Sequence, residues 1–166
     1  MKISHYSFIF LFALFLFSCS QKAEQVFEKA STTSSKWPNA VTYEIFVQSF
    51  NDSNGDGIGD FKGMTDKVDN LQELGVGAVW LMPIMPSPSY HKYDVTNYRD
   101  VHSDYGTMDD FKTFVRKAHE ANIKVVIDLV INHSSAEHTW FLKSKANDPD
   151  YREYYVWADK DSVAKQ

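Results

Sequence analysis

Apolar residues change their spacing along this chain, alternating between the pattern of strands and the pattern of helices. Residues 41–47, "VTYEIFV", are rich in β-branched and aromatic side chains, as is typical of a strand. Two more short apolar runs of this kind follow, at 76–83 and 124–132. The segments between them repeat their apolar residues at helical spacing. The chain is therefore expected to run strand, helix, strand, helix, strand.

Both intervening helices carry signals at their ends. The first is expected over 64–75, where Gly75 offers a C-terminal stop and one apolar stripe runs through Met64, Val68, Leu71 and Leu74. Thr107 is suited to cap the second helix, with Asp109 and Asp110 at its positive end. Its apolar face would consist of Phe111, Phe114, Val115 and Ala118.

Strands separated by single helices pair in parallel through right-handed crossovers, which makes this an α/β protein. The sheet is either doubly wound or part of a (β/α)8 TIM barrel, and periodicity alone does not choose between them. A whole barrel takes about 250 residues, whereas this chain has 166. A barrel would therefore be represented by its amino-terminal part, about three βα units. The nearly continuous apolar run at 124–132 predicts that helices cover both faces of the sheet.

Polar residues follow each expected strand, at 52–60, at 91–94 and at 132–133. Ligands gather at the carboxyl ends of parallel strands. We therefore expect one functional face. The composition, 43% apolar and 15% aromatic, is that of a globular protein, and the net charge of −5 argues against a nucleic-acid partner.

The amino terminus predicts export. Residues 1–18 combine Lys2 with an apolar run over 6–17 that is shorter than the roughly 20 residues of a membrane span. The segment Leu16-Phe17-Ser18-Cys19 resembles a bacterial lipoprotein box, which would place a lipid on Cys19 and a flexible tether at 19–38. The protein would then be anchored to a membrane of the cell envelope, on its periplasmic or surface face. An ordinary signal peptide with an incidental cysteine is the alternative.

The loop at 52–60 carries alternating oxygen ligands for a hard cation: Asp52, Asn54, Asp56, the backbone carbonyl of Ile58, and Asp60. Gly57 permits the sharp turn. A bound Ca²⁺ would relieve the repulsion between the carboxylates, so we expect a structural calcium site. A solvated turn is the simpler reading. An EF-hand is disfavoured, because the twelfth position is Gly63 rather than glutamate and a strand precedes the loop.

Three stretches in chain order are similar to the alpha-amylase family, glycoside hydrolase family 13: "YEIFVQSFNDSNGDGIGDFKG", "LQELGVGAVWLMPIMPSPSYHKYDVTNYRDV" and "DLVINHSS". The first resembles strand one with its calcium loop, in the version of oligo-1,6-glucosidase and related amylases. The others resemble strand two with a sugar-site segment, and strand three. The resemblance implies that 39–132 is the first part of a (β/α)8 barrel and that 133–166 begins an inserted B domain.

The same resemblance assigns substrate contacts. Tyr93 would stack on the sugar at the cleaved bond, Asp94 would shape that pocket, and His133 would hydrogen-bond a hydroxyl of the same sugar. Asn132 would organise the loop after strand three. Lys92 stands where relatives often carry glycine and is expected to narrow or decorate the pocket opening. Without the resemblance, packing, a turn and a strand terminus would explain Tyr93, Asp94 and His133.

The implied activity is retaining hydrolysis of α-glucans, starch and maltooligosaccharides. In the family, the nucleophile and the acid/base follow strands four and five, so the resemblance places both beyond Gln166 and none of this chain's residues is expected to be catalytic. Asp128 is read as structural. The isolated chain is expected to be inactive and to bind Ca²⁺ weakly. A non-catalytic lipoprotein remnant that binds calcium or sugar is the alternative.

Overall fold

The computed structural model describes residues 38–158, all within one compact unit of the chain. The predicted signal peptide, Cys19 and all but the last residue of the predicted tether lie outside the described residues. Within 38–158, no helix combines the length and apolar character needed to cross a bilayer.

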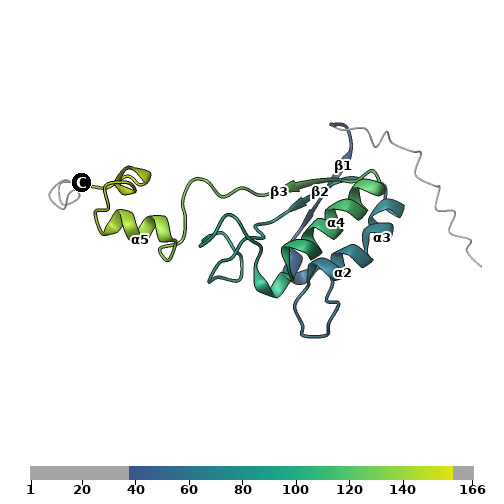
Figure 1. Ribbon diagram of the computed structural model, residues 1–166. Coiled ribbons are helices and arrows are strands. Elements are labelled where there is room, and N and C mark those ends of the chain that lie inside the picture. Colours follow the sequence, from purple (N-terminus) through teal and green to yellow (C-terminus); the bar gives the residue numbers. More distant parts are fainter. Residues whose placement is uncertain (1–37, 159–166) are drawn as a thin grey trace, which may run out of the picture. The chain divides into compact units, whose positions relative to one another are not determined.

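Three parallel strands form the sheet, as the sequence predicts, and their order is β1-β2-β3. They are β1 (Val41–Ile45), β2 (Val76–Leu81) and β3 (Lys124–Ile127), shown in Figure 1. In register, Val79 lies between Tyr43 and Val125, and Trp80 lies between Glu44 and Val126. Because side chains alternate across a strand, these two rows point to opposite faces.

Helices cover only one face of this sheet within the described residues, which corrects the expectation of two covered faces. Helix α3 (Val68–Glu73) packs on β2, and α4 (Met108–Glu120) packs on β3 (Figure 1). Val79 on the helix side is fully buried, whereas Trp80 and Val126 on the other side are 42% and 39% exposed.

Strand β3 ends earlier than its apolar run. The predicted strand over 124–132 stops at Ile127, and the last backbone bond along β2 runs from the Asp128 N–H to the Leu81 carbonyl, 2.9 Å long. Pro83 lies two residues after the end of β2 and has no backbone N–H to donate to the next position of β3. The prediction is wrong beyond Ile127, where the chain continues without a strand partner within 38–158.

Strand β1 is also shorter than predicted, because a 3₁₀ turn, η1 (Val47–Ser49), follows Ile45. The single helix predicted over 64–75 is instead two short helices, α2 (Phe61–Asp66) and α3, which meet at Lys67. The side chain of Asp60 caps α2 by accepting from the Gly63 N–H, which starts the helix three residues early.

Gly63 allows α2 to lie against the preceding loop. A Cβ at this position would stand 2.0 Å from the Asn51 carbonyl oxygen, so any larger residue forces the backbone apart. The Asn51 amide also donates to the Gly63 carbonyl at 3.1 Å. The start of α2 is therefore fixed by tertiary contacts rather than by helix propensity.

Helix α4 agrees with its prediction. Thr107 and Asp110 form a complete capping box, and Phe114 and Ala118 are buried. The core between sheet and helices also contains Ile45, Phe61, Met64, Val68, Leu71, Val79 and Leu81. After β3 the chain forms α5 (Thr139–Lys145) and the turn η3 (Arg152–Tyr154), and η2 (Ser103–Tyr105) precedes α4.

Aromatic residues after 133 pack mainly on one another. Phe141 stacks on Trp157 at 5.7 Å between ring centroids, and the Trp157 indole donates to the Ser144 hydroxyl. Trp140 meets Tyr154 edge to face at 5.6 Å. This supports packing as their main role. Their assignment to the start of a B domain stays a prediction.

Candidate functional site

His133 lies against the segment that carries Tyr93 and Asp94. Tyr93 and Asp94 belong to the segment after β2, and His133 to the segment after β3; both segments leave the sheet at the same end (Figure 1). The His133 Nε2 lies 3.1 Å from the Tyr93 carbonyl oxygen. A carbonyl only accepts hydrogen bonds, so Nε2 carries the proton, and in the neutral ring Nδ1 remains an acceptor.

Asp128 holds the phenol of Tyr93. The Tyr93 hydroxyl donates to Asp128 Oδ2 at 2.8 Å, and this bond, with burial, raises the pKa of Tyr93 to about 12. The phenol is therefore neutral at physiological pH. Asp128 itself is fixed through its backbone bond to Leu81. The sequence indicates a structural Asp128 without indicating this partner.

Asp94 is held by two serines that sequence reasoning missed. The hydroxyls of Ser87 and Ser89 both donate to its Oδ1. Burial acts to raise the pKa of Asp94, but these bonds and the nearby His91 together keep the pKa below its ordinary value. Asp94 is therefore a carboxylate at neutral pH. The "SPS" run before it is a local signal that turn-forming residues precede the site.

Lys92 does not decorate the pocket opening, which corrects the expectation. It adopts a positive φ of 63°, a conformation that glycine reaches without strain. Lys92 is only 4% exposed, and its Nζ donates to the Ser89 carbonyl at 3.0 Å. Burial lowers the pKa of Lys92, and Asp104 and Asp94 oppose that effect.

Tyr98, also missed from sequence, anchors the segment after β3. Its hydroxyl lies 2.7 Å from the Val130 carbonyl oxygen and 3.0 Å from that of His133. Asn132 is exposed and, with His133, borders a groove of about 810 Å³ that Tyr98 and Trp140 also line. The sequence predicts that Asn132 organises this loop; in the structure, Tyr98 makes the contacts to the Val130 and His133 carbonyl oxygens.

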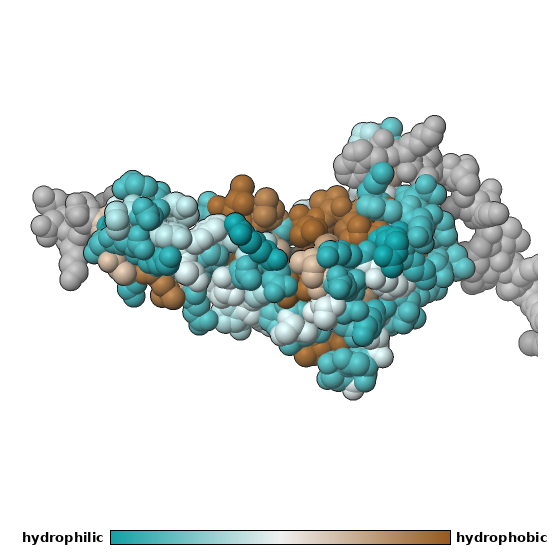
Figure 2. Space-filling model, viewed as in Figure 1, coloured by the Kyte–Doolittle hydropathy of each residue, from teal (hydrophilic) through white to brown (hydrophobic). Residues whose placement is uncertain are grey.

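Exposed apolar residues adjoin the site. Figure 2 shows brown patches over β3 and over the extended segment that follows it. The residues are Val126 and Ile127, about 40% exposed, and Leu129 and Ile131, 63% and 79% exposed.

Asp52 organises the loop predicted to hold calcium. Its Oδ1 accepts from the backbone N–H groups of Asn54 and Gly55, and its Oδ2 accepts from that of Gly57. The bonds from Gly57 and Gly55 hold the pKa of Asp52 below its ordinary value. Gly57 has a φ of 88°, so the turn does require glycine there.

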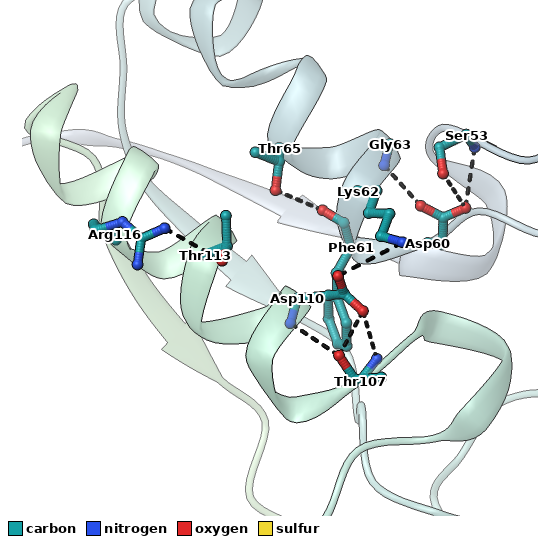
Figure 3. Close-up of polar contacts among 10 residues, drawn as sticks. All are labelled: Ser53, Asp60, Phe61, Lys62, Gly63, Thr65, Thr107, Asp110, Thr113 and Arg116. Carbon is teal, nitrogen blue, oxygen red and sulfur yellow. Dashed lines mark hydrogen bonds and ion pairs between the residues drawn. The ribbon is translucent and has the colours of Figure 1, made fainter.

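The other carboxylates of the loop have different partners. Asp56 Oδ1 accepts from the Ile58 N–H, and its Oδ2 accepts from the Asn54 amide. Figure 3 shows Asp60 directed to Ser53 and Gly63 instead. Burial acts to raise the pKa of Asp60, and the bonds from Gly63 and Ser53 lower it below its ordinary value.

The donor set suits Ca²⁺ in kind, because carboxylate and amide oxygens are its preferred ligands. Each carboxylate oxygen can also accept a second partner beside a backbone N–H. Among residues 38–158, no three His, Cys, Asp or Glu side chains gather closely enough to hold a metal by themselves. The predicted ligand set also includes the Asn54 amide and the Ile58 carbonyl oxygen, and the calcium site stays a prediction.

Comparison with known proteins defines the class. The profile "Alpha amylase, catalytic domain" matches residues 44–166, so the chain belongs to the alpha-amylase family. The fold is accordingly the amino-terminal part of a (β/α)8 barrel, which decides between the two folds that the sequence left open.

Individual relatives agree with this assignment. The chain is 55% identical over 124 residues to alpha-amylase 3 of Dictyoglomus thermophilum, covering 74% of this chain and 25% of the relative. It is 51% identical over 123 residues to oligo-1,6-glucosidase of Parageobacillus thermoglucosidasius, covering 73% and 22%. The crystal structure of alpha-amylase from H. orenii matches with a TM-score of 0.68 and 53% identity, over 72% of this chain and 26% of that one. The chain thus spans about a quarter of the length of the curated relatives.

Proposed function

We propose that the protein acts on α-glucans, starch and maltooligosaccharides, as a retaining glycoside hydrolase, and that Tyr93, Asp94 and His133 bind the sugar next to the cleaved bond. The observation that carries this proposal is the contact of the His133 ring with the backbone of Tyr93, the residue next to Asp94. Relatives named alpha-amylase and oligo-1,6-glucosidase support it.

Each of the three residues offers what a pyranose ring needs. The ring of Tyr93 presents a flat apolar face to sugar C–H groups, and its bond to Asp128 fixes the phenol. The ionised Asp94 accepts a sugar hydroxyl more strongly than a neutral group does. His133 uses Nε2 on the Tyr93 carbonyl, which leaves Nδ1 as the ring nitrogen that would bind a second sugar hydroxyl. Bonds of this kind that tighten in the transition state accelerate glycoside cleavage.

We assign no catalytic carboxylate within 38–158. A retaining mechanism needs two carboxyl groups about 5 Å apart. Two carboxylates near the proposed site have other partners: Asp94 accepts from serine hydroxyls and Asp128 accepts from Tyr93. The nucleophile and the acid/base are proposed to come from strands four and five of the barrel, and the 166-residue chain alone is expected to release no reducing sugar.

Calcium is proposed as a structural cofactor. Asp52, Asn54, Asp56, the Ile58 carbonyl and Asp60 would hold Ca²⁺ in the loop that joins β1 to α2. The ion would supply positive charge that offsets carboxylate repulsion. Export and anchoring to a cell-envelope membrane through lipid on Cys19 are proposed from the amino-terminal sequence.

Binding of maltotriose to the 166-residue chain, followed by NMR, tests the proposal. We expect shift changes at Tyr93, Asp94 and His133, and a weakening of about tenfold or more in Tyr93→Ala, because stacking on an aromatic face is lost. Tyr151→Ala is the matched control, since Tyr151 packs against Lys143 and Tyr154. Equal binding by wild type and Tyr93→Ala would refute the assigned site.

A further inference from the structure

Two serine hydroxyls bind the same oxygen of Asp94. Ser87, 8% exposed, and Ser89 both donate to Oδ1. A serine hydroxyl has one hydrogen to donate, so each commits that hydrogen to Asp94. Within residues 38–158, Oδ2 accepts no bond from another side chain. The two oxygens of this carboxylate therefore differ: one is held by the protein and the other is free to accept from a ligand.

The backbone of each serine is fixed in turn by a basic side chain. Lys92 Nζ donates to the Ser89 carbonyl at 3.0 Å, and His102 Nε2 lies 3.1 Å from the Ser87 carbonyl oxygen. Because that oxygen only accepts, Nε2 of His102 carries a proton. Both bonds hold the loop from its buried side.

A buried aromatic ring supports both basic side chains. Tyr105 is fully buried, the Lys92 Nζ lies 5.7 Å from its ring centroid, and the His102 ring centroid is also 5.7 Å away. An ammonium group at this distance is attracted by the face of the ring. Tyr105 thus contacts Lys92 and His102. These two bind the backbone of Ser89 and Ser87, and the two serines hold Asp94.

We propose that Ser87 and Ser89, braced by Lys92 and His102, are positioning residues that hold Asp94 by Oδ1 and leave Oδ2 to accept a hydroxyl of the bound glucan. This rests on the proposed function, because it assigns Asp94 to sugar binding. Hydroxyl donors from two separate residues fix both the position and the rotation of the carboxylate, which a single donor would leave free to turn. The arrangement preorganises the acceptor before sugar arrives.

Carbon-13 NMR titration of the Asp94 carboxyl in the 166-residue chain tests the positioning directly. His91 and Lys92 are the charged or titratable groups that face Asp94, and both are kept. We expect the Asp94 pKa to rise in Ser87→Ala and in Ser89→Ala, and to rise further in the double variant. Ser89→Thr, which keeps a hydroxyl, should restore the wild-type value. Ser49→Ala is the control, since the Ser49 hydroxyl binds only the Phe46 carbonyl.

Maltotriose affinity of the same variants supplies the second readout, with a loss of about tenfold expected in the double variant. An unchanged Asp94 pKa in the double variant would overturn the proposal, as would a raised pKa with unchanged affinity. If wild type binds no maltotriose, the proposed function fails and the sugar role of the serines fails with it, while the titration still reports on the serines alone. If circular dichroism shows that Ser87→Ala does not fold, the Asp94 pKa in Ser89→Ala and Ser89→Thr tests the proposal instead.

Discussion

The phenol of Tyr93 and the carboxylate of Asp128 are joined by a hydrogen bond of 2.8 Å across 35 residues of chain. It links the segment after β2 to the end of β3. Asp128 is fixed by its backbone bond to β2, so the ring of Tyr93 is held relative to the sheet itself. The ring that we propose to bind sugar is therefore attached to the sheet.

Asp128→Asn tests this link. The amide cannot stabilise the neutral phenol as a carboxylate does, so we expect the Tyr93 pKa to fall from about 12 toward its ordinary value of 10.0. Carbon-13 NMR of the Tyr93 Cζ, which is resolved from the other tyrosines, measures the change. Asp109→Asn, on the exposed surface of α4, is the control. A Tyr93 pKa that stays near 12 in Asp128→Asn would show that burial alone sets it.

Stability should fall at alkaline pH for the same reason. Tyr93 and Tyr105 both have folded-state pKa values raised to about 12, the first mainly by Asp128 and the second by burial. A raised pKa contributes stability that is complete below the unfolded value of about 10 and is lost as pH rises through 12. Urea denaturation at pH 9 to 12 measures this loss. Asp128→Asn should flatten it, and an unchanged slope would contradict the assignment.

Asp60→Ala removes the N-terminal cap of α2. We expect the free energy of unfolding to fall by about 1–2 kcal/mol, because the Gly63 N–H loses its acceptor. The pKa of Asp60 is lowered in the fold, so its contribution is present above the ordinary value of 3.8 and disappears as pH falls below it. Urea denaturation at pH 7 and pH 3 measures both effects. The control is Asp66→Ala at the end of α2, and an equal loss in both variants would contradict the capping role.

Gly63→Ala tests the close approach of α2 to Asn51. A Cβ 2.0 Å from the Asn51 carbonyl must displace backbone, so we expect a loss of about 2 kcal/mol or more despite the better helix propensity of alanine. Lys62→Ala, on the exposed side of α2, should change stability little. Equal stability of Gly63→Ala and wild type, measured by chemical denaturation, would mean that the loop moves freely away.

Calcium should stabilise the loop at 52–60. We expect added Ca²⁺ to raise the melting temperature by a few degrees, with chelator reversing the effect. Asp52→Asn with Asp56→Asn should abolish the response, because two charged ligands are lost. Asp104→Asn serves as a control outside the loop. A calcium response that survives in the double variant would place the ion elsewhere.

Local patterns predicted the elements whose ends are set by local chemistry. Thr107 caps α4 as expected, with Asp109 and Asp110 in the first turn of the helix. The end of β3 at Ile127 depends instead on backbone bonds to β2, which is distant in the chain, and nothing in the structure explains the break at Lys67. No periodicity encodes such bonds.

In the candidate site too, some features could be predicted from the sequence and others depend on contacts between distant residues. Tyr93, Asp94 and His133 could be named from the residues that resemble the family, and the structure places the His133 ring against the backbone of Tyr93. The bonds from the serines to Asp94 and the burial of Lys92 could not be predicted from the sequence. Both depend on how the segment at 87–94 packs over Tyr105.

Intermolecular nuclear Overhauser effects between maltotriose and the 166-residue chain measure the central claim most directly. If Tyr93, Asp94 and His133 form a sugar site, the aromatic protons of Tyr93 give cross-peaks to sugar C–H protons, and Tyr93→Phe keeps them. Cross-peaks to other aromatic residues with none to Tyr93, or saturating maltotriose that leaves all three residues unperturbed, would contradict the account.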